Sequence, residues 1–135
     1  VDGVYDLGIS LETMEHIPED MVDGYLEILA RSVRRAVLLT VPNEIGIPFL
    51  AKYIAKKILY RDSKDEPYTL SEFFSAIFGQ TSKIHRNEHK GFDYRKFTRQ
   101  VSDKFVIQSV QGVPYGWLLP SLSFTVGIVA IPRRD

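Results

Sequence analysis

The sequence lacks cysteine, net charge and any apolar segment long enough to cross a membrane. Without cysteine, the chain has neither a disulfide framework nor a zinc site built on thiolates. Lysine plus arginine number 17, and aspartate plus glutamate also number 17, so no overall field attracts nucleic acid or an anionic membrane. The longest apolar stretch, Val126 to Ile131, is far shorter than the ~20 residues of a membrane helix. These absences favour a cytoplasmic protein with no nucleic-acid partner and no transmembrane segment.

The length and the first residues indicate one domain cut from a longer chain. The 135 residues are enough to bury a single core. The chain opens with Val1-Asp2-Gly3, without an initiator methionine and without the basic start or apolar core of a signal peptide. We therefore expect residues 1–135 to form a single partial domain.

The pattern of apolar residues predicts alternating strands and helices. Apolar runs at 4–10 and 36–41 predict two strands, and helical spacing after Pro18 predicts a helix between them. A helix between neighbouring strands implies a right-handed parallel crossover, whereas the last two strands are expected to pair antiparallel. The predicted order is β-α-β-α-α-α-β-β, and the last two strands are expected at 105–110 and 121–131.

Capping residues predict two helix starts, and apolar spacing predicts which helix faces are buried. Thr69 and Glu72 have the spacing of a capping box. Asp93 is a candidate N-cap for a later helix. The residues predicted to face inward are Tyr94, Phe97 and Val101 in the helix after Asp93, and Ile47, Leu50, Ile54 and Ile58 in an earlier helix.

Two motifs carry a resemblance to a known family. The first is YDLGISLETMEHIP at residues 5–18, and the second is LLTVPN at residues 38–43. A third segment, HKGFDYRKF at residues 89–97, supports them. Together with the predicted order of elements, they resemble the carboxyl-terminal half of class I, Rossmann-like methyltransferases that use S-adenosylmethionine, in the branch that acts on small molecules and quinones. By this resemblance the four strands correspond to strands four to seven of that family.

The resemblance implies a fold, a cofactor and a reaction. The implied fold is α/β, with a mostly parallel sheet that ends in an antiparallel pair and carries helices on both faces. The implied reaction is methyl transfer from S-adenosylmethionine to a small-molecule acceptor, with oxygen as the expected acceptor atom. Ser10, Leu11 and Glu12 are implied to lie beside the cofactor.

The sequence also departs from the family. The family's strands one to three, with the glycine-rich turn that holds most of the cofactor, have no counterpart in this sequence. An alternative function is therefore a non-catalytic half-domain, which dimerises or is completed by a partner chain that supplies the amino-terminal half. The edge of a parallel sheet rarely stays unpaired, so a homo-oligomer is expected.

Glu12, Glu15 and His16 form the candidate catalytic group. Their i, i+3 and i+4 spacing places all three on one face if a helical turn forms. Such a turn would follow the carboxyl end of a strand, where open α/β sheets bind ligands. Histidine titrates near neutral pH, so His16 is suited to be a general base that Glu15 orients. The alternative is that both carboxylates only stabilise a helix start and His16 is a boundary residue.

A metal site is a further hypothesis. The resemblance makes His89 a candidate catalytic residue, and Glu12, Glu15, His16 and His89 are ligand types that suit magnesium, manganese or zinc. No spacing fixes the fourth ligand, so a divalent metal and a metal-free site are both open. His89 is equally compatible with a solvated loop.

Three further features bear on substrates and partners. The loop VPYGWLLP at 113–120 is unusually apolar, which favours an interface. Asn43, after the second motif, is interpreted as a turn residue rather than a substrate contact. One helix face carries the cations Lys52, Lys56, Lys57 and Arg61. A solvated surface is a simpler interpretation of this face than a binding site for anions.

Overall fold

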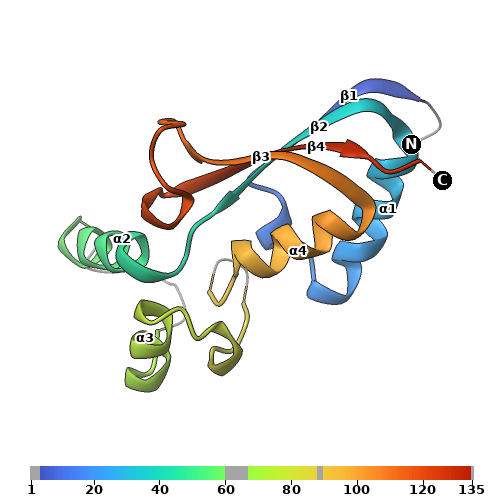
Figure 1. Cartoon of the computed structure of the whole chain (residues 1–135). Coiled ribbons are helices and arrows are strands. Elements are labelled where there is room, and N and C mark those ends of the chain that lie inside the picture. The colour runs from blue at the N-terminus through green and yellow to red at the C-terminus, as the bar shows by residue number, and fades with distance from the viewer. Residues whose placement is uncertain (1–3, 60–66, 88–89, 135) are drawn as a thin grey trace.

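The computed structural model describes residues 4–59, 67–87 and 90–134, which form a four-stranded sheet with helices (Figure 1). The strands are β1 (Tyr5–Leu11), β2 (Val33–Pro42), β3 (Phe105–Val113) and β4 (Thr125–Pro132). The longer helices are α1 (Val22–Ser32), α2 (Gly46–Leu59), α3 (Leu70–Ile77) and α4 (Tyr94–Lys104). The predicted succession of strands and helices is confirmed.

The sheet is mixed, with the strand order β1-β2-β4-β3. Strands β1 and β2 are parallel and are joined through α1, whereas β4 runs antiparallel to both β2 and β3. The parallel crossover and the closing antiparallel pair are both as predicted from the sequence. This topology establishes an α/β fold.

The main core lies between one face of the sheet and the pair α1 and α4. Leu39 of β2 and Ile128 of β4 are fully buried on this face. Leu26 of α1 and Phe97 of α4 pack in the same cluster. The inward positions predicted for α4 are confirmed, since Tyr94, Phe97 and Val101 are all buried.

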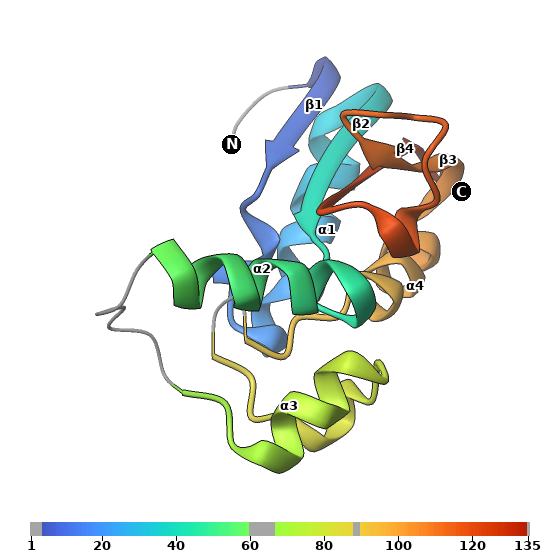
Figure 2. The same ribbon diagram turned by 90° about the vertical axis from the view of Figure 1, so that its left-hand side faces the viewer.

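The opposite face of the sheet is left open by the described helices, which corrects the expectation of helices on both faces. Figure 1 shows α1 and α4 on the same side of the sheet. Figure 2 shows α2 crossing beyond the ends of β1 and β2, with α3 below it. The reason is that α2 packs on α3 and on the 3₁₀ helix Pro120–Leu122 rather than on the sheet. Leu7 and Ile9 on the open face are 65% and 64% exposed.

The buried face of α2 was predicted wrongly. Ile47 and Ile58 are 67% and 72% exposed, whereas Pro48 and Phe49 are buried. Phe49 packs against the ring of Tyr68 at a centroid distance of 5.0 Å, in a second cluster formed with α3. An aromatic ring buries more area than an isoleucine side chain, so this contact decides which way the helix turns.

Both helix caps form as predicted. The Thr69 side chain accepts a hydrogen bond from the Glu72 amide, and the Glu72 carboxylate accepts one from the Thr69 amide at 3.0 Å. The Asp93 side chain accepts a hydrogen bond from the Arg95 amide at 2.9 Å. In the described part of the chain, no helix is both long and apolar enough to cross a membrane.

Glu72 also joins α3 to the segment that leads to α4, in a way that predicts a dependence of stability on pH. Its carboxylate accepts hydrogen bonds from the amides of Thr69 and His85 and pairs with the Lys90 ammonium at 3.1 Å. The Thr69 amide, then Lys90 and the His85 amide, lower the pKa of Glu72 from 4.5 to about 2. Because the folded pKa is depressed, this stabilisation is complete above about pH 4.5 and is lost as pH falls toward 2.

We therefore expect Glu72→Gln to be less stable than the wild type at pH 6, with a difference that shrinks steadily toward pH 2.5. Denaturant melts of both proteins at several pH values measure this difference. Glu27→Gln, which removes an exposed carboxylate of α1, is the control and should show little difference at any pH. If Glu72→Gln loses the same amount of stability at pH 6 and at pH 2.5, the depressed pKa of Glu72 is not the cause of the loss.

Candidate functional site

The carboxyl end of β1 is closed by a strained turn at Glu12. The Glu12 backbone has a positive φ of 47°, which non-glycine residues rarely adopt. Its amide donates to both the carbonyl oxygen and the side-chain oxygen of Thr40, at 3.0 and 3.2 Å. These two bonds hold the turn in place at the end of β2, the neighbouring strand. The chain therefore leaves the sheet at the carboxyl ends of the parallel strands, where ligands bind in α/β folds.

Glu15 and His16 follow this turn in a 3₁₀ helix, Met14–His16. The two neighbours differ in exposure: the Glu15 side chain is fully buried, whereas that of His16 is 49% exposed. Glu15 Oε1 lies 3.8 Å from His16 Nε2. Neither Glu15 oxygen accepts a hydrogen bond from the described part of the chain. A buried carboxylate therefore lies close to a half-exposed imidazole without a hydrogen bond to it, and we call these two residues the Glu15–His16 pair.

The structure corrects the predicted common helical face of Glu12, Glu15 and His16. The helix is only three residues long and starts at Met14, so Glu12 lies before it, at the end of the strand. The positive φ of Glu12 breaks the helical periodicity on which the prediction depended. Only Glu15 and His16 are brought together, and Glu12 is placed at the strand end by its backbone.

The three predicted cofactor residues do not share one environment. Leu11 is 55% exposed on the open face of the sheet, and Glu12 is exposed at the turn. Ser10 is buried, and its side-chain oxygen accepts a hydrogen bond from the Tyr25 hydroxyl at 3.3 Å. Ser10 therefore belongs to the α1 side of the sheet. Leu11 and Glu12 are exposed at the strand end and Ser10 is buried, and their contacts with a cofactor stay a prediction.

The predicted metal site has no support from the described residues. Across residues 4–59, 67–87 and 90–134, no three histidine, aspartate or glutamate side chains lie close enough together to hold a metal ion. His89 lies outside the described residues, so its predicted roles as a catalytic residue and as a ligand are not placed. Arg61, from the predicted basic face, is outside them as well.

Asn43 has a structural role, as the sequence indicated. It is fully buried, and its amide nitrogen donates to the carbonyl oxygens of Pro120 and Ser123 at 3.1 and 3.0 Å. Its side-chain oxygen accepts a hydrogen bond from the Ile45 amide. Asn43 thus ties the end of β2 to the loop before β4. Lys52, from the predicted basic face, is also used internally, since it pairs with Glu44 at 2.9 Å.

Asn43→Ala is expected to lower the free energy of unfolding by about 2 kcal/mol, because the carbonyl groups of Pro120 and Ser123 and the Ile45 amide each lose a hydrogen bond. Denaturant unfolding measures the change. The matched control is Gln108→Ala, which alters an exposed side chain of β3 and should change stability by less than about 0.5 kcal/mol. Equal effects of the two substitutions would contradict this role for Asn43.

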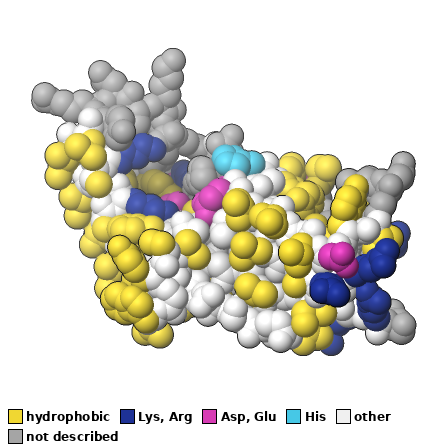
Figure 3. Space-filling view, turned by 90° about the horizontal axis from the view of Figure 1, so that it is seen from above, with side chains coloured by type: hydrophobic (Ala, Val, Ile, Leu, Met, Phe, Trp, Pro, Cys, Tyr) yellow, Lys and Arg dark blue, Asp and Glu magenta, His cyan; other side chains and the backbone are white. Residues whose placement is uncertain are grey.

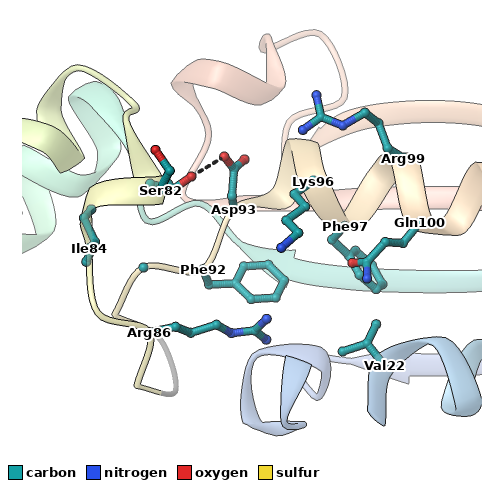
Figure 4. A pocket seen from close by; sticks show the side chains of 12 residues that line it. Val22, Ser82, Ile84, Arg86, Phe92, Asp93, Lys96, Phe97, Arg99 and Gln100 are labelled. Atoms are coloured by element: carbon teal, nitrogen blue, oxygen red, sulfur yellow. Dashed lines mark hydrogen bonds between the residues drawn. The ribbon is translucent and has the colours of Figure 1, made fainter. Parts of the chain in front are cut away.

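A pocket of about 250 Å³ lies between α4, the start of α1 and the segments 81–86 and 91–92 (Figure 4). Its inner wall is formed by the buried rings of Phe92 and Phe97. Arg86 lies over the Phe92 ring, 5.3 Å from its centroid, and donates to the carbonyl oxygen of Ile17 at 3.3 Å. The pocket thus adjoins the residue after His16.

Two cations at this pocket share one carboxylate. Glu19 pairs with Arg86 at 3.4 Å and also with Lys96, so one carboxylate joins α4 to the turn before α1. Hydrogen bonding to Lys96 lowers the pKa of Glu19. Sequence reasoning did not identify this network, because Arg86 and Lys96 lie 67 and 77 positions from Glu19 along the chain. No local spacing signals such a contact.

The comparisons with known proteins leave the site to be interpreted from its own residues. No family model matches the chain, and no curated protein matches it.

Proposed function

We propose that this chain is the carboxyl-terminal half of an S-adenosylmethionine-dependent methyltransferase that methylates an oxygen of a small molecule. The observation that carries the proposal is the Glu15–His16 pair at the carboxyl end of β1: a fully buried carboxylate 3.8 Å from a half-exposed imidazole. A buried carboxylate behind an accessible histidine is the arrangement that orients a general base.

Two further findings support the family assignment. The observed order of elements, with a parallel β1–β2 pair and a closing antiparallel β3–β4 pair, is the order that the sequence resemblance requires. The two motifs at 5–18 and 38–43 lie on adjacent strands, and both reach the same edge of the sheet. A Rossmann-like methyltransferase half thus remains the proposed identity of this α/β fold.

The chain's own residues would carry the proton. Glu15 Oε1 lies 3.8 Å from Nε2 of His16, beyond hydrogen-bond distance, so the carboxylate would act on the imidazole through its charge while His16 accepts the proton of the acceptor hydroxyl. The buried Glu15 carboxylate would then stabilise the imidazolium cation that forms. S-adenosylmethionine, when bound, supplies the methyl group. Leu11 and Glu12 would contact the cofactor from the carboxyl end of β1. The described residues supply only this part of a cofactor site.

The test is transfer of a tritiated methyl group from S-adenosylmethionine to a panel of small phenols, enols and amines. The proposal predicts label on hydroxyl-bearing acceptors. Label on amines alone would contradict oxygen as the acceptor atom, and no transfer to any acceptor would leave the non-catalytic half-domain as the function of this chain.

A second candidate function is a non-catalytic module that associates with another chain. The open face of the sheet favours it, because Leu7 and Ile9 expose most of their side chains. Methyl transfer is preferred, since association alone gives no reason for the buried carboxylate of the Glu15–His16 pair.

A further inference from the structure

The pocket beside α4 combines aromatic walls with cationic side chains. Phe92 and Phe97, which form its inner wall, are 3% and 2% exposed. Arg86, Lys96 and Arg99 also line the pocket. Figure 4 shows Arg86 and Lys96 extending toward the Phe92 ring from below and from above. Aromatic rings and positive charge therefore meet in one hollow.

The pocket differs in character from the surface on the other side of the sheet. Figure 3 shows hydrophobic side chains spread across that side, while the lysine and arginine side chains lie toward the two ends of the view. At the pocket, cations surround a hollow whose inner wall is apolar. An apolar wall with a few convergent polar groups is typical of sites for small ligands.

Two carboxylates near the pocket are used by contacts within the structure. Asp93 accepts hydrogen bonds from Nε and Nη2 of Arg95 at 2.9 and 2.8 Å, and from the Thr81 hydroxyl at 2.8 Å. Asp23 of α1 accepts a hydrogen bond from the Gln100 side chain at 3.3 Å. Neither set of contacts involves the two cations that extend over the aromatic wall.

Glu19 shows that a carboxylate fits between these two cations. It belongs to the 3₁₀ helix Glu19–Met21, just before α1, and its carboxylate pairs with Nη1 of Arg86 at 3.4 Å and with Nζ of Lys96. The Glu19 side chain is 46% exposed, and ion pairs between exposed groups contribute little to stability. The carboxylate of a ligand can therefore take the place of Glu19 with little loss of stability.

The volume of the pocket limits the ligand to a small molecule. Its volume of about 250 Å³ is below the ~300–1,000 Å³ of pockets for drug-sized ligands. It is larger than an apolar cavity of ~150 Å³, which is enough to hold benzene. A single ring that carries one carboxylate fits between these limits.

We propose that this pocket binds a small organic acid in which one carboxylate is attached to a single apolar ring. The ring packs against Phe92 and Phe97, and the carboxylate replaces that of Glu19 between Arg86 and Lys96. This site does not depend on methyl transfer, so either proposal can fail alone.

The experiment is a titration of the isotope-labelled chain with sodium benzoate at constant ionic strength, followed by amide NMR. Saturable shifts are expected at Phe92 and Lys96, with a Kd on the order of 1 mM. Benzamide keeps the ring without the charge, and acetate keeps the carboxylate without the ring, so each should bind at least ~10-fold more weakly. The proposal is overturned if benzoate gives no saturable shifts around the pocket, or if benzamide or acetate binds as tightly as benzoate.

Two substitutions should move the Kd for benzoate in opposite directions. Glu19→Gln removes the competing carboxylate and should tighten binding about fivefold, whereas Lys96→Gln removes a cation of the site and should weaken binding about fivefold. Both side chains are about half exposed, so circular dichroism should show both variants folded as the wild type is.

Lys83→Gln is the matched control. Lys83 is an exposed lysine of the segment 81–86 that does not line the pocket, so its replacement should change the Kd by less than about twofold. If Glu19→Gln binds benzoate no more tightly than the wild type, the ligand does not take the place of Glu19 and the proposal is wrong.

Discussion

His16→Ala should lower the turnover of methyl transfer by about a hundredfold, with little change in the KM for the acceptor. The reason is that removal of a positioned general base typically costs 10²-fold or more in the chemical step, while binding contacts stay in place. The change is measured by initial rates over a range of concentrations of the acceptor that takes up label from S-adenosylmethionine.

The matched control is His85→Ala, which removes an exposed imidazole from the loop before α4. It should keep near wild-type turnover. Unchanged turnover in His16→Ala would remove it from the mechanism.

Glu15→Met should raise the free energy of unfolding by about 2 kcal/mol. The Glu15 side chain is fully buried, and its oxygens accept no hydrogen bond from the described residues. A buried polar group without a hydrogen bond costs ~1–3 kcal/mol, and methionine fills a similar volume without that cost. The same variant should lose turnover, because His16 loses the group that orients it. Such an exchange of stability against activity is typical of functional residues.

Denaturant unfolding measures the stability of Glu15→Met, with Glu27→Met as the control. Glu27 is partly exposed on α1, so its replacement should change stability by no more than about 0.5 kcal/mol. A marked loss of stability in Glu15→Met would mean that the carboxylate is held by favourable contacts. In that case the pair would be an element of the structure rather than a site retained for function.

The elements of this fold could be predicted from the sequence wherever the signal was local. The capping box at Thr69 and Glu72 and the N-cap at Asp93 depend on neighbours within a few residues, and both formed as predicted. The parallel pairing of β1 and β2 followed from the helix between them, because chain connectivity restricts how two such strands can lie.

The predictions from the sequence failed where tertiary contacts decided which residues are buried. The apolar spacing of α2 predicted that Ile47 and Ile58 were buried, but aromatic contacts of Phe49 turned that face to solvent. At the site, the sequence identified Glu15 and His16 but not their difference in exposure. The sequence also did not reveal the positive φ of Glu12, which no spacing rule signals.

The most direct test of the proposed methyltransferase is a titration of the isotope-labelled chain with S-adenosylhomocysteine, followed by amide NMR. This measurement detects weak binding and also locates it. The account predicts that the amides of Leu11 and Glu12 shift in a saturable manner, while those of the distant Asp103 and Lys104 on α4 do not. Saturable shifts confined to other parts of the chain, or no shifts at millimolar ligand, would contradict a cofactor site at the end of β1.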